Sequence, residues 1–422
     1  MKEHKLLTKR FGEIDPFSIE DFVNVGGYET LKKAMKMTSE EIIYEVEASR
    51  ITGRGGANFP TYMKMRAMSK ETGDMYLVCN ADEGEPGNFK DKHLMEKDPH
   101  QLIEGMLISA YAVGANRGYI YIRGEYQSAV YLLEHAINEA RKHGYLGQDI
   151  CGKDFHFDLE VRQGAGAYVC GEEFALLESI EGKPGRTRVK PPFPTEAGLF
   201  MKPTLINNVE TFSTLPHIIE MSGEEYGKLG SSFASGTKLI SLSGNVKHKG
   251  LYEVEYGTTI RQVIEELGGG VSNGQKINMV QLGGACGPII PEHLLDMDID
   301  NERFEIFNSK MGAGAIIVID DRFDLFEILL RTMTFFAHES CGKCAPCREG
   351  HIQIVKLLQK FYDTKVTYKD YESLVSLANV IHETALCGLG QTSTTSILAT
   401  VEFFQYYYQQ RIRQSERREW AL

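Results

Sequence analysis

The sequence predicts an α/β protein built in three parts. Strand-like and helix-like segments alternate through the first half of the chain, which is the pattern of a parallel sheet covered by helices. Strand-like segments and one helix then follow closely between Lys238 and Ile319, which indicates a small α+β unit. From Phe323 onward the pattern is helical except around a run of cysteines.

Length and composition limit the class of protein. The chain has 422 residues, which is too long for one ordinary core. Its 42% hydrophobic and 25% charged residues are typical of a soluble globular protein, and its net charge of −12 argues against non-specific binding to nucleic acid. We find no apolar run of membrane-spanning length, about 18 residues, and no apolar signal core in M-K-E-H-K-L-L. We therefore expect a protein of the cytoplasm or an equivalent reducing compartment.

The elements of the first part follow from periodicity and turn signals. Thr38 and Glu41 form a capping box at the start of the first clear helix. In order, we expect helix Ser39–Ser49, strand Met75–Cys79, helix Pro99–Val113, strand Tyr119–Arg123, helix Tyr126–Lys142, strand Phe155–Val161 and helix Glu172–Ile180. The segment K-P-G-R-T-R-V-K-P-P-F-P-T that follows cannot form a helix interior, so we expect a surface loop that is a candidate binding wall.

The second part is expected to contain four strands and one helix. They are strand Lys238–Ser243, strand Leu251–Tyr256, helix Thr258–Leu267, strand Ile277–Leu282 and strand Ala315–Ile319. We place the domain boundaries so that residues 1–235 form the first domain, 236–321 the second and 322–422 the third.

Four of the eight cysteines have the spacing of a metal centre. Cys341, Cys344 and Cys347 stand three residues apart, and Cys387 follows in the flexible turn L-C-G-L-G. A tight run plus one remote cysteine recurs around iron–sulfur clusters, so we interpret the set as the site of a [4Fe–4S] cluster. The rival metal is zinc, which usually takes cysteines in separated pairs, and free thiols in a turn are the third interpretation. The other four cysteines are scattered, and we expect each to be a small buried residue.

Three loops are candidates for cofactor binding. G-R-G-G-A-N-F-P (Gly53–Pro60) only approximates a dinucleotide fingerprint, because Asn58 replaces its third glycine and the segment follows a helix. N-A-D-E-G-E-P-G (Asn80–Gly87) lies where a parallel strand ends, and its carboxylates suit hydroxyls, amides or ring N–H groups better than phosphate. G-A-G-A-Y-V-C-G-E-E (Gly164–Glu173) also follows a strand and opens a helix.

Each loop also has a purely structural interpretation: a tight turn, a solvated acidic turn, or carboxylates that favour a helix dipole. Two such loops at neighbouring strand ends favour one shared crevice instead. A cluster carries single electrons, a nicotinamide gives two as hydride, and a flavin converts between them. We therefore hypothesise a flavin-containing NADH oxidoreductase, with Glu173 as a candidate to bind the ribose 2′-OH and favour NADH over NADPH.

Six motifs in order resemble one known family. They are G-R-G-G-A-N-F-P-T, N-A-D-E-G-E-P-G, G-A-G-A-Y-V-C-G-E-E, K-P-P-F-P, I-N-N-V-E-T and E-S-C-G-K-C-A-P-C-R-E-G. The chain is similar, over nearly its whole length, to the NADH-binding flavoprotein subunit of respiratory complex I. The resemblance implies FMN, NADH as substrate and one [4Fe–4S] cluster. It also implies a Rossmann-like flavin domain, a ubiquitin-like β-grasp domain and a C-terminal helical bundle that holds the cluster.

The resemblance assigns expected roles to the motif residues. The FMN phosphate and ribityl chain would be lined by Gly53, Arg54, Gly55, Gly56 and Lys64, and the rest of FMN would be held by Asn80, Asp82, Glu83, Asn207, Asn208 and Thr211. Glu85 would lie near the nicotinamide; Tyr168, Gly171 and Glu172 would close the pocket; Glu173 would contact the NADH ribose; and Phe59, Phe193 and Lys190 would surround adenine. Cys341, Cys344, Cys347 and Cys387 would hold the cluster. The chain departs from the family pattern at Asn58, Tyr62 and Met65, where glycine, glycine and tryptophan are usual.

The resemblance also implies a mechanism and partners. Hydride would pass from NADH to FMN, and single electrons would pass to the cluster. From there they would reach a thioredoxin-like [2Fe–2S] protein (the E subunit of complex I), a large iron–sulfur protein (the G subunit) and finally quinone, in the peripheral arm on the cytoplasmic side of a membrane complex. The near alternative is the diaphorase subunit of an NAD-linked hydrogenase or formate dehydrogenase. A non-enzymatic electron relay or scaffold and a zinc-stabilised binding module are the alternatives from other classes.

Overall fold

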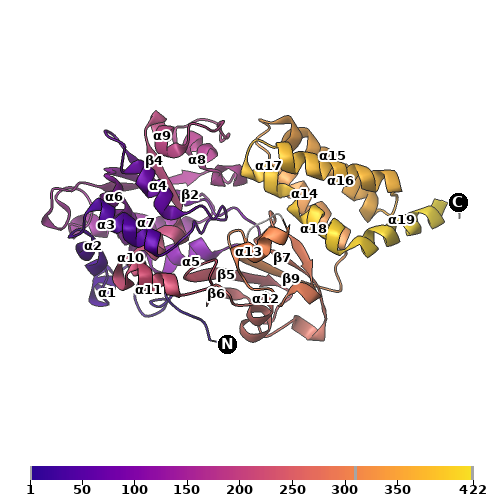
Figure 1. Ribbon diagram of the computed structural model, residues 1–422, viewed down its shortest axis with the longest axis horizontal. Helices are drawn as coiled ribbons and strands as arrows, with labels where there is room; N and C mark the ends of the chain where they lie inside the picture. The colour runs from indigo at the N-terminus through magenta and orange to yellow at the C-terminus, as the bar shows by residue number, and fades with distance from the viewer. Residues whose placement is uncertain (1, 308–310, 420–422) are drawn as a thin grey trace.

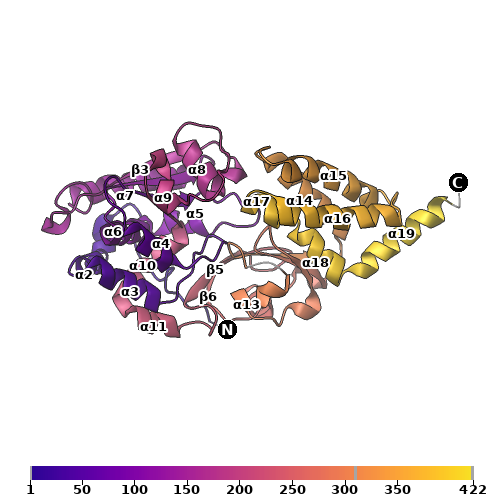
Figure 2. The ribbon, with the colours of Figure 1, turned by 45° about the horizontal axis from the view of Figure 1, so that its top comes forward.

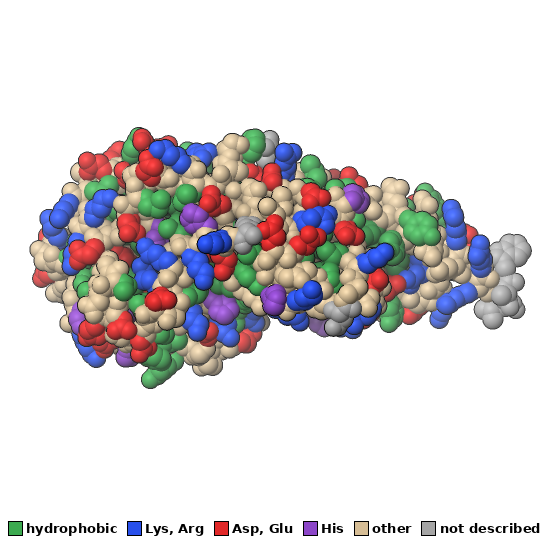
Figure 3. Space-filling model, turned by 90° about the horizontal axis from the view of Figure 1, so that it is seen from below, with side chains coloured by type: hydrophobic (Ala, Val, Ile, Leu, Met, Phe, Trp, Pro, Cys, Tyr) green, Lys and Arg blue, Asp and Glu red, His purple; other side chains and the backbone are tan. Residues whose placement is uncertain are grey.

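The computed structural model describes residues 2–307 and 311–419 as an elongated molecule (Figure 1). The first sheet and its helices form one end, the helices after Leu325 form the other, and the second sheet lies between and below them. The N-terminus lies beside the second sheet, whereas α19 (Gln405–Glu419) projects from the far end. Seen from below, acidic and basic side chains are intermixed along the whole visible face (Figure 3).

The first sheet has four strands, all parallel, in the order β3-β2-β1-β4. They are β1 (Tyr76–Ala81), β2 (Arg117–Arg123), β3 (Asp158–Gly164) and β4 (Thr204–Asn208). The predicted parallel α/β fold is thus confirmed. β4 is not among the predicted strands, because five residues after a proline-rich segment are too few to show a period. In the sheet, Asn80 is in register with both Tyr121 and Asn208, so the carboxyl ends of the strands meet at one edge.

Helices cover both faces of this sheet. The helices are α1 (Ile19–Asn24), α2 (Glu29–Ala34), α3 (Ser39–Ala48), α4 (Thr61–Met68), α5 (Lys90–Lys97), α6 (Pro99–Val113), α7 (Gln127–Lys142), α8 (Glu173–Ile180), α9 (Pro194–Ala197), α10 (Val209–Met221) and α11 (Gly223–Lys228). The face with Leu77, Cys79 and Ile120 packs against α2 to α7 and α10. The face with Val78 and Tyr121 packs against α8 and continues into the core of the C-terminal helices. α3 has the predicted capping box.

β3 begins three residues later than the sequence predicts. Phe157 instead forms a local antiparallel bridge with Gly147, and the Phe155 ring packs edge-on against Tyr111 of α6. These two apolar side chains therefore anchor the turn before the strand and are not part of the sheet.

The second sheet has five strands in the order β6-β5-β9-β7-β8. They are β5 (Thr237–Gly244), β6 (Gly250–Glu255), β7 (Ile277–Leu282), β8 (Ile289–Pro291) and β9 (Ala315–Asp320). β5 and β9 pair in parallel and the other neighbours are antiparallel. The sequence analysis missed β8, which has three residues. The predicted helix at 258–267 is one α-helical turn, α12 (Ile260–Gln262), followed by a π-helical turn (Val263–Leu267), and α13 (Asn301–Phe304) is a further short helix.

The C-terminal part is helical, as predicted, and stacks beside the second sheet (Figure 2). Its helices are α14 (Leu325–Glu339), α15 (Ala345–Tyr362), α16 (Tyr368–Thr384), α17 (Gly388–Ser393), α18 (Thr395–Phe403) and α19. Phe326 stacks on Phe361, and both rings meet Tyr408 edge-on, which fastens α19 to α14 and α15. Within the described residues, no helix is both long enough and apolar enough to cross a membrane.

Two buried carboxylates join the first part to the second sheet. Glu253 of β6 accepts hydrogen bonds from the N–H groups of Leu7 (2.9 Å) and Thr8 (3.0 Å). Glu210, in the first turn of α10, contacts the ammonium groups of Lys90 (3.0 Å) and Lys238 (2.7 Å). Burial opposes ionisation of Glu210, but the two ammonium groups outweigh it and lower the pKa of this carboxyl. Buried charged contacts therefore add to the apolar packing that holds the two sheets together.

Candidate functional site

The carboxyl ends of the first sheet form one edge at which the predicted cofactor loops meet, and we call this edge the strand-end site. The Asn80 side chain donates to the Gly171 carbonyl (2.8 Å), which ties the acidic loop to the loop after β3. Asn208 donates to the Asn80 carbonyl (3.3 Å). Gly55 lies so close to Asn208 that an added Cβ would stand 3.0 Å from the Asn208 Cβ. The three loops that the sequence analysis selected are thus neighbours in space.

The glycine loop, residues 53–60, leads directly into α4. Gly56 (φ +115°) and Asn58 (φ +54°) have left-handed backbone conformations. Asparagine therefore supplies at position 58 a conformation that glycine usually takes, at modest cost. The Arg54 N–H donates to Thr211 Oγ1 (2.9 Å), so Thr211 holds the loop against α10.

The Arg54 guanidinium lies away from the strand-end site. It is buried, donates to the Tyr256 hydroxyl (2.8 Å) and the Ser235 carbonyl (2.7 Å), and lies 4.7 Å from the centre of the Tyr256 ring. Tyr256 directly follows β6, so this side chain fastens the glycine loop to the second sheet. The backbone of Arg54 therefore belongs to the glycine loop at the strand-end site, whereas its positive charge lies against the second sheet.

Three buried polar atoms at the strand ends have no hydrogen-bond partner within the described part of the chain. They are the amide nitrogen and oxygen of Asn207 and the Oδ2 atom of Asp82. Burial raises the pKa of Asp82 to about 7, although the Arg123 guanidinium opposes the shift. An unsatisfied buried polar group costs about 1–3 kcal/mol, so a polar ligand that reached these atoms would remove that cost. A flavin ring, which offers both N–H donors and carbonyl acceptors, fits the donors and acceptors that these residues leave open.

Glu83 differs from Asp82 because the protein itself occupies its oxygens. The carboxylate accepts from the N–H groups of Asp91 (2.9 Å) and Lys92 (3.0 Å) and from the Tyr126 hydroxyl (3.2 Å). Burial raises the pKa of Glu83 to about 7. Glu83 therefore holds the start of α5, and Asp82 is the neighbouring carboxylate that remains open to a ligand.

Glu85 is fixed from two other parts of the molecule. Its Oε2 accepts from the Tyr168 hydroxyl (2.6 Å), and its Oε1 accepts from the N–H of Cys286 (3.1 Å), in the loop between β7 and β8. Burial raises the pKa of Glu85. Gly284 of the same loop has φ +98°, and an added Cβ would lie 2.3 Å from the Glu85 Cγ. The sequence analysis missed this contribution, although L-G-G-A-C-G-P directly after a strand was a signal for it.

Tyr168 connects the acidic loop to the helical part. Its ring packs against Phe335 of α14, with 5.1 Å between ring centres, and its N–H donates to the Glu339 carboxylate (2.8 Å). Glu172, four residues on, accepts from the N–H groups of Phe174 (3.1 Å) and Ala175 (3.0 Å), so it caps α8.

Two residues expected at NADH lie on α8 and the proline-rich loop. Lys190 pairs with the Glu173 carboxylate and lies 3.5 Å from Glu172 Oε1. Lys64 of α4, which is expected at the FMN phosphate and ribityl chain, donates to the Ile206 carbonyl (2.6 Å), and burial lowers its pKa to about 8 against the attraction of Glu173.

Phe59 and Phe193 expose about half of their side chains, 46% and 51% respectively. They precede α4 and α9, which pack on each other. Both rings are thus open to a stacking partner. Gly53 lies at the start of the glycine loop, where it donates its N–H to the Phe59 carbonyl (2.8 Å).

The four predicted metal-binding cysteines line one cavity. Cys341 and Cys344 lie in the turn between α14 and α15, Cys347 lies in the first turn of α15, and Cys387 directly precedes α17. The cavity is lined by these four residues together with Val169, Thr187, Ser340, Lys343, Leu386 and Leu389. Val169 and Thr187 belong to the first part, so the cavity borders on the elements of the strand-end site.

The positions of the four sulfur atoms bear on the choice between the predicted metals. Tetrahedral zinc with Zn–S bonds of about 2.3 Å would hold its sulfurs about 3.8 Å apart. Among the described residues, the one group of three or more metal-ligating side chains within 4.8 Å of each other is the exposed set Asp149, Asp154 and His156. No three of the four cysteine sulfurs therefore all lie within 4.8 Å of one another, which is not the arrangement of a closed tetrahedral zinc site.

Cys347 has the most polar surroundings of the four. Its Sγ lies 3.1 Å from Ser340 Oγ and 3.6 Å from His351 Nδ1. Burial raises the pKa of Cys347 to about 11, and the other three cysteine sulfurs add to the shift. Burial also raises the pKa of Cys387, although the N–H groups of Leu389 and Gly390 oppose it.

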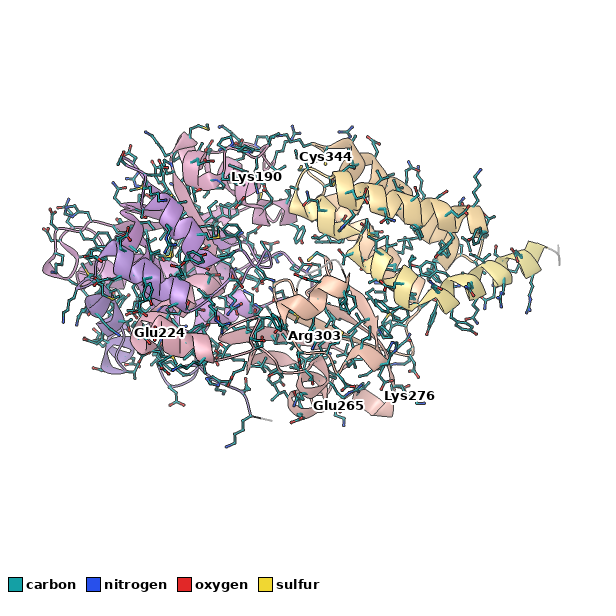
Figure 4. All side chains as sticks on the ribbon, viewed as in Figure 1. Lys190, Glu224, Glu265, Lys276, Arg303 and Cys344 are labelled. Carbon is teal, nitrogen blue, oxygen red and sulfur yellow. The ribbon has the colours of Figure 1, made fainter. Side chains whose placement is uncertain are left out.

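The cavity is also joined to the proline-rich loop. Lys343, between two of the cysteines, donates to the Thr187 carbonyl (2.7 Å). In Figure 4, Lys190 and Cys344 lie on the same upper side of the molecule, on facing elements. One loop therefore carries both Lys190 and a contact to the cysteine turn.

The remaining cysteines only partly match the expectation. Cys79 and Cys170 are buried as predicted and Cys286 is half-buried. Cys151 is exposed, which corrects the prediction; it lies in a turn with left-handed backbone (φ +52°) that holds its side chain outside the core.

Three family models match the chain in the order of its parts. Residues 46–217 match the Nuo51 FMN-binding domain, residues 239–290 match the SLBB domain, and residues 327–411 match the NADH-ubiquinone oxidoreductase-F iron–sulfur binding region. The FMN and cluster assignments of the sequence analysis are confirmed by these matches.

Relatives agree with this division. The F subunit of the NADH-quinone oxidoreductase of Aquifex aeolicus (strain VF5) is 44% identical over 94% of this chain and 92% of its own. The NADP-reducing hydrogenase subunit HndC of Solidesulfovibrio fructosivorans is 42% identical over 97% of this chain and 83% of its own. A crystal structure of an NAD+-reducing [NiFe]-hydrogenase in the H2-reduced state superposes with a TM-score of 0.84 at 33% identity, over 98% of this chain and 67% of that chain.

Proposed function

The chain belongs to the family of the F subunits of NADH-quinone oxidoreductases, and from this premise we propose that it oxidises NADH within a larger electron-transfer complex. When bound, FMN supplies the exchange between the two-electron chemistry of NADH and the single-electron chemistry of the cluster. The observation that carries the proposal is the set of open polar atoms on Asn207 and Asp82 at the strand ends. The same molecule also has the four-cysteine cavity, whose lining includes Val169 and Thr187 of the first part.

In this proposal the residues of the strand-end site bind and orient. Asp82 and Asn207 hold the flavin ring through their open donors and acceptors, while Asn80 and Asn208 fix the loops that carry them. The glycine loop approaches the phosphate with its backbone, because the Arg54 side chain is engaged elsewhere.

Glu85 is the proposed catalytic residue, in contact with the nicotinamide. Its two oxygens are held by Tyr168 and Cys286, so the carboxylate has one fixed orientation before the nucleotide binds. Glu173 and Lys190 form a charged pair, and the rings of Phe59 and Phe193 are exposed. We propose that this pair and these rings bind the adenosine half of NADH.

The electron acceptor beyond the cluster is proposed from the family. It is a thioredoxin-like [2Fe–2S] protein (the E subunit of complex I), then a large iron–sulfur protein (the G subunit) and quinone, in the peripheral arm of a membrane complex on the cytoplasmic side. The second candidate is the diaphorase subunit of an NAD-linked hydrogenase, which is favoured by the similarity to a hydrogenase subunit and to a solved hydrogenase.

The deciding experiment is a visible spectrum of the protein, purified anaerobically with its small partner subunit, before and after NADH is added. We expect a flavin band and a broad cluster shoulder that NADH bleaches and NADPH bleaches less. Folded protein with no flavin and no response to NADH would overturn the enzyme proposal and leave an electron relay or scaffold. A response to NADH with quinone as acceptor, or with a hydrogenase partner, would separate the two candidates.

A further inference from the structure

Of the four cavity cysteines, Cys347 is the buried one, and two side chains reach its sulfur. Ser340 Oγ, at 3.1 Å, also accepts the N–H of Gly342 (3.3 Å), so the hydroxyl proton is free to point at the sulfur. His351 stands one helical turn after Cys347 on α15, which brings its Nδ1 to 3.6 Å from the same sulfur.

A second residue controls which nitrogen of the His351 ring carries the proton. The Nε2 atom lies 2.7 Å from Ser393 Oγ, on α17, the helix that begins after Cys387. A ligating thiolate offers only lone pairs, so a favourable contact with Nδ1 requires the proton on Nδ1. Nε2 is then an acceptor, and the Ser393 hydroxyl is its donor. In the chain without a cluster, the Ser393 hydroxyl donates to the Gly390 carbonyl (2.8 Å), and the Phe336 carbonyl is a further acceptor for the ring. The tautomer with the proton on Nδ1 therefore requires the Ser393 hydroxyl proton to turn from Gly390 to Nε2 when Cys347 is a ligating thiolate.

We propose that Ser393 and His351 act as positioning residues that aim one N–H at the Cys347 sulfur, and that this contact raises the reduction potential of the cluster. A hydrogen bond to a ligating sulfur stabilises the extra negative charge of the reduced cluster, and partners behind a ligand tune the metal centre. The inference rests on the assignment of these cysteines as cluster ligands and not on the nicotinamide chemistry.

The test is an EPR-monitored redox titration of the protein, purified anaerobically with its small partner subunit. His351→Leu removes both ring nitrogens, and we expect the ratio of reduced to oxidised cluster at a fixed potential to fall about tenfold, which is about 59 mV for a one-electron couple. His351→Asn keeps an N–H donor and is expected to restore part of the shift. Ser393→Ala is expected to lower the potential less than His351→Leu.

The double variant separates a relay from two independent effects. If Ser393 acts only through His351, adding Ser393→Ala to His351→Leu causes no further shift. The matched control is Ser396→Ala, which removes a nearby buried hydroxyl that has no hydrogen-bond partner within the described residues. This control is expected to leave the potential unchanged.

An unchanged potential in His351→Leu, with the EPR signal of the dithionite-reduced protein intact, would overturn the proposal. Additive shifts in the double variant, or an unchanged potential in Ser393→Ala, would overturn the relay. If His351→Leu does not retain the cluster, Ser393→Ala decides by the same criterion, because it removes a single hydroxyl. Flavin bleaching by NADH, measured on the same samples, reports on the proposed function separately, since a potential shift without bleaching would refute only that function.

Discussion

The strand-end site and the cysteine cavity are assembled in opposite ways. Three of the four cavity cysteines come from one short turn, residues 341–347, and the fourth directly precedes a neighbouring helix. The strand-end site draws on three loops of the first part, a loop of the second sheet and, through Tyr168, a helix of the third part. The set of cysteine ligands is therefore supplied locally, whereas the strand-end site depends on how all three parts are packed together.

The largest effect is expected from a substitution that disrupts only the set of cysteine ligands. Cys344→Ser removes one thiolate, and we expect the cluster EPR signal of the dithionite-reduced protein to be lost completely. Because the strand-end site is built from other segments, bound FMN should still be bleached by NADH. Cys151→Ser, at an exposed cysteine outside both sites, is the matched control. Loss of flavin along with the cluster would show that the two sites are not separable.

Gly284→Ala tests whether the second sheet is part of the strand-end site. The added Cβ would collide with Glu85, so we expect the rate of flavin reduction by NADH to fall about a hundredfold, the cost of misplacing a group by roughly 1 Å. The FMN content should not change. Gly270→Ala is the control, since Gly270 also has positive φ (+77°) but nothing within 4 Å of an added Cβ. Equal rates in the two variants, measured by stopped flow, would remove the second sheet from the site.

The pH dependence of FMN binding tests the open carboxylate. The pKa of Asp82 without a ligand is raised to about 7 by burial. A flavin N–H binds the ionised form, so binding below about pH 7 must release a proton. The dissociation constant for FMN should therefore fall up to about tenfold per pH unit as the pH rises toward this pKa and level off above it. Fluorescence quenching by the deflavinated protein measures this, and Asp82→Asn should show no such slope. The opposite slope would mean that a protonated Asp82 donates to the flavin.

The smallest expected effect on the strand-end site is that of Arg54→Lys. The guanidinium contacts Tyr256 and Ser235, so we expect the free energy of unfolding to drop by about 2 kcal/mol in urea denaturation, through lost buried hydrogen bonds. FMN affinity should change less than about twofold. The control Arg66→Lys affects an exposed pair with Glu47 and should leave the free energy of unfolding nearly unchanged. A large loss of FMN affinity with unchanged stability would place the Arg54 charge at the phosphate.

The difference between the local cysteine set and the strand-end site, which is assembled from distant segments, explains which features could be predicted from the sequence. The cysteine set was found because its ligands are close in sequence and their type is specific to the chemistry. The acidic loop was found because it follows a strand whose apolar run is visible. β4 and β8 were missed because five and three residues are too short to show a period.

Contacts between distant segments left no local pattern in the sequence. Cys286 is 201 residues from Glu85, so only the folded chain shows that its N–H holds that carboxylate. Packing likewise determines that an N–H group at the start of α5 occupies Glu83 and that the Arg54 side chain turns toward Tyr256. In each case the sequence shows which residue types are present but not which oxygen or nitrogen is already engaged.

The contact between the N-terminal segment and Glu253 sets an order for making the protein. Thr8 precedes Glu253 by 245 residues, so it leaves the ribosome long before its partner exists. The first sheet can begin to form as its own strands emerge. Its attachment to the second sheet through Glu253 must wait until β6 has been synthesised, and before then the N-terminal segment has only its contacts to the first part, such as those of Arg10 with Asp98 (2.7 Å) and Gln101 (2.7 Å). Because the loop after β7 also holds Glu85, the strand-end site is complete only once this later part of the second sheet has been synthesised.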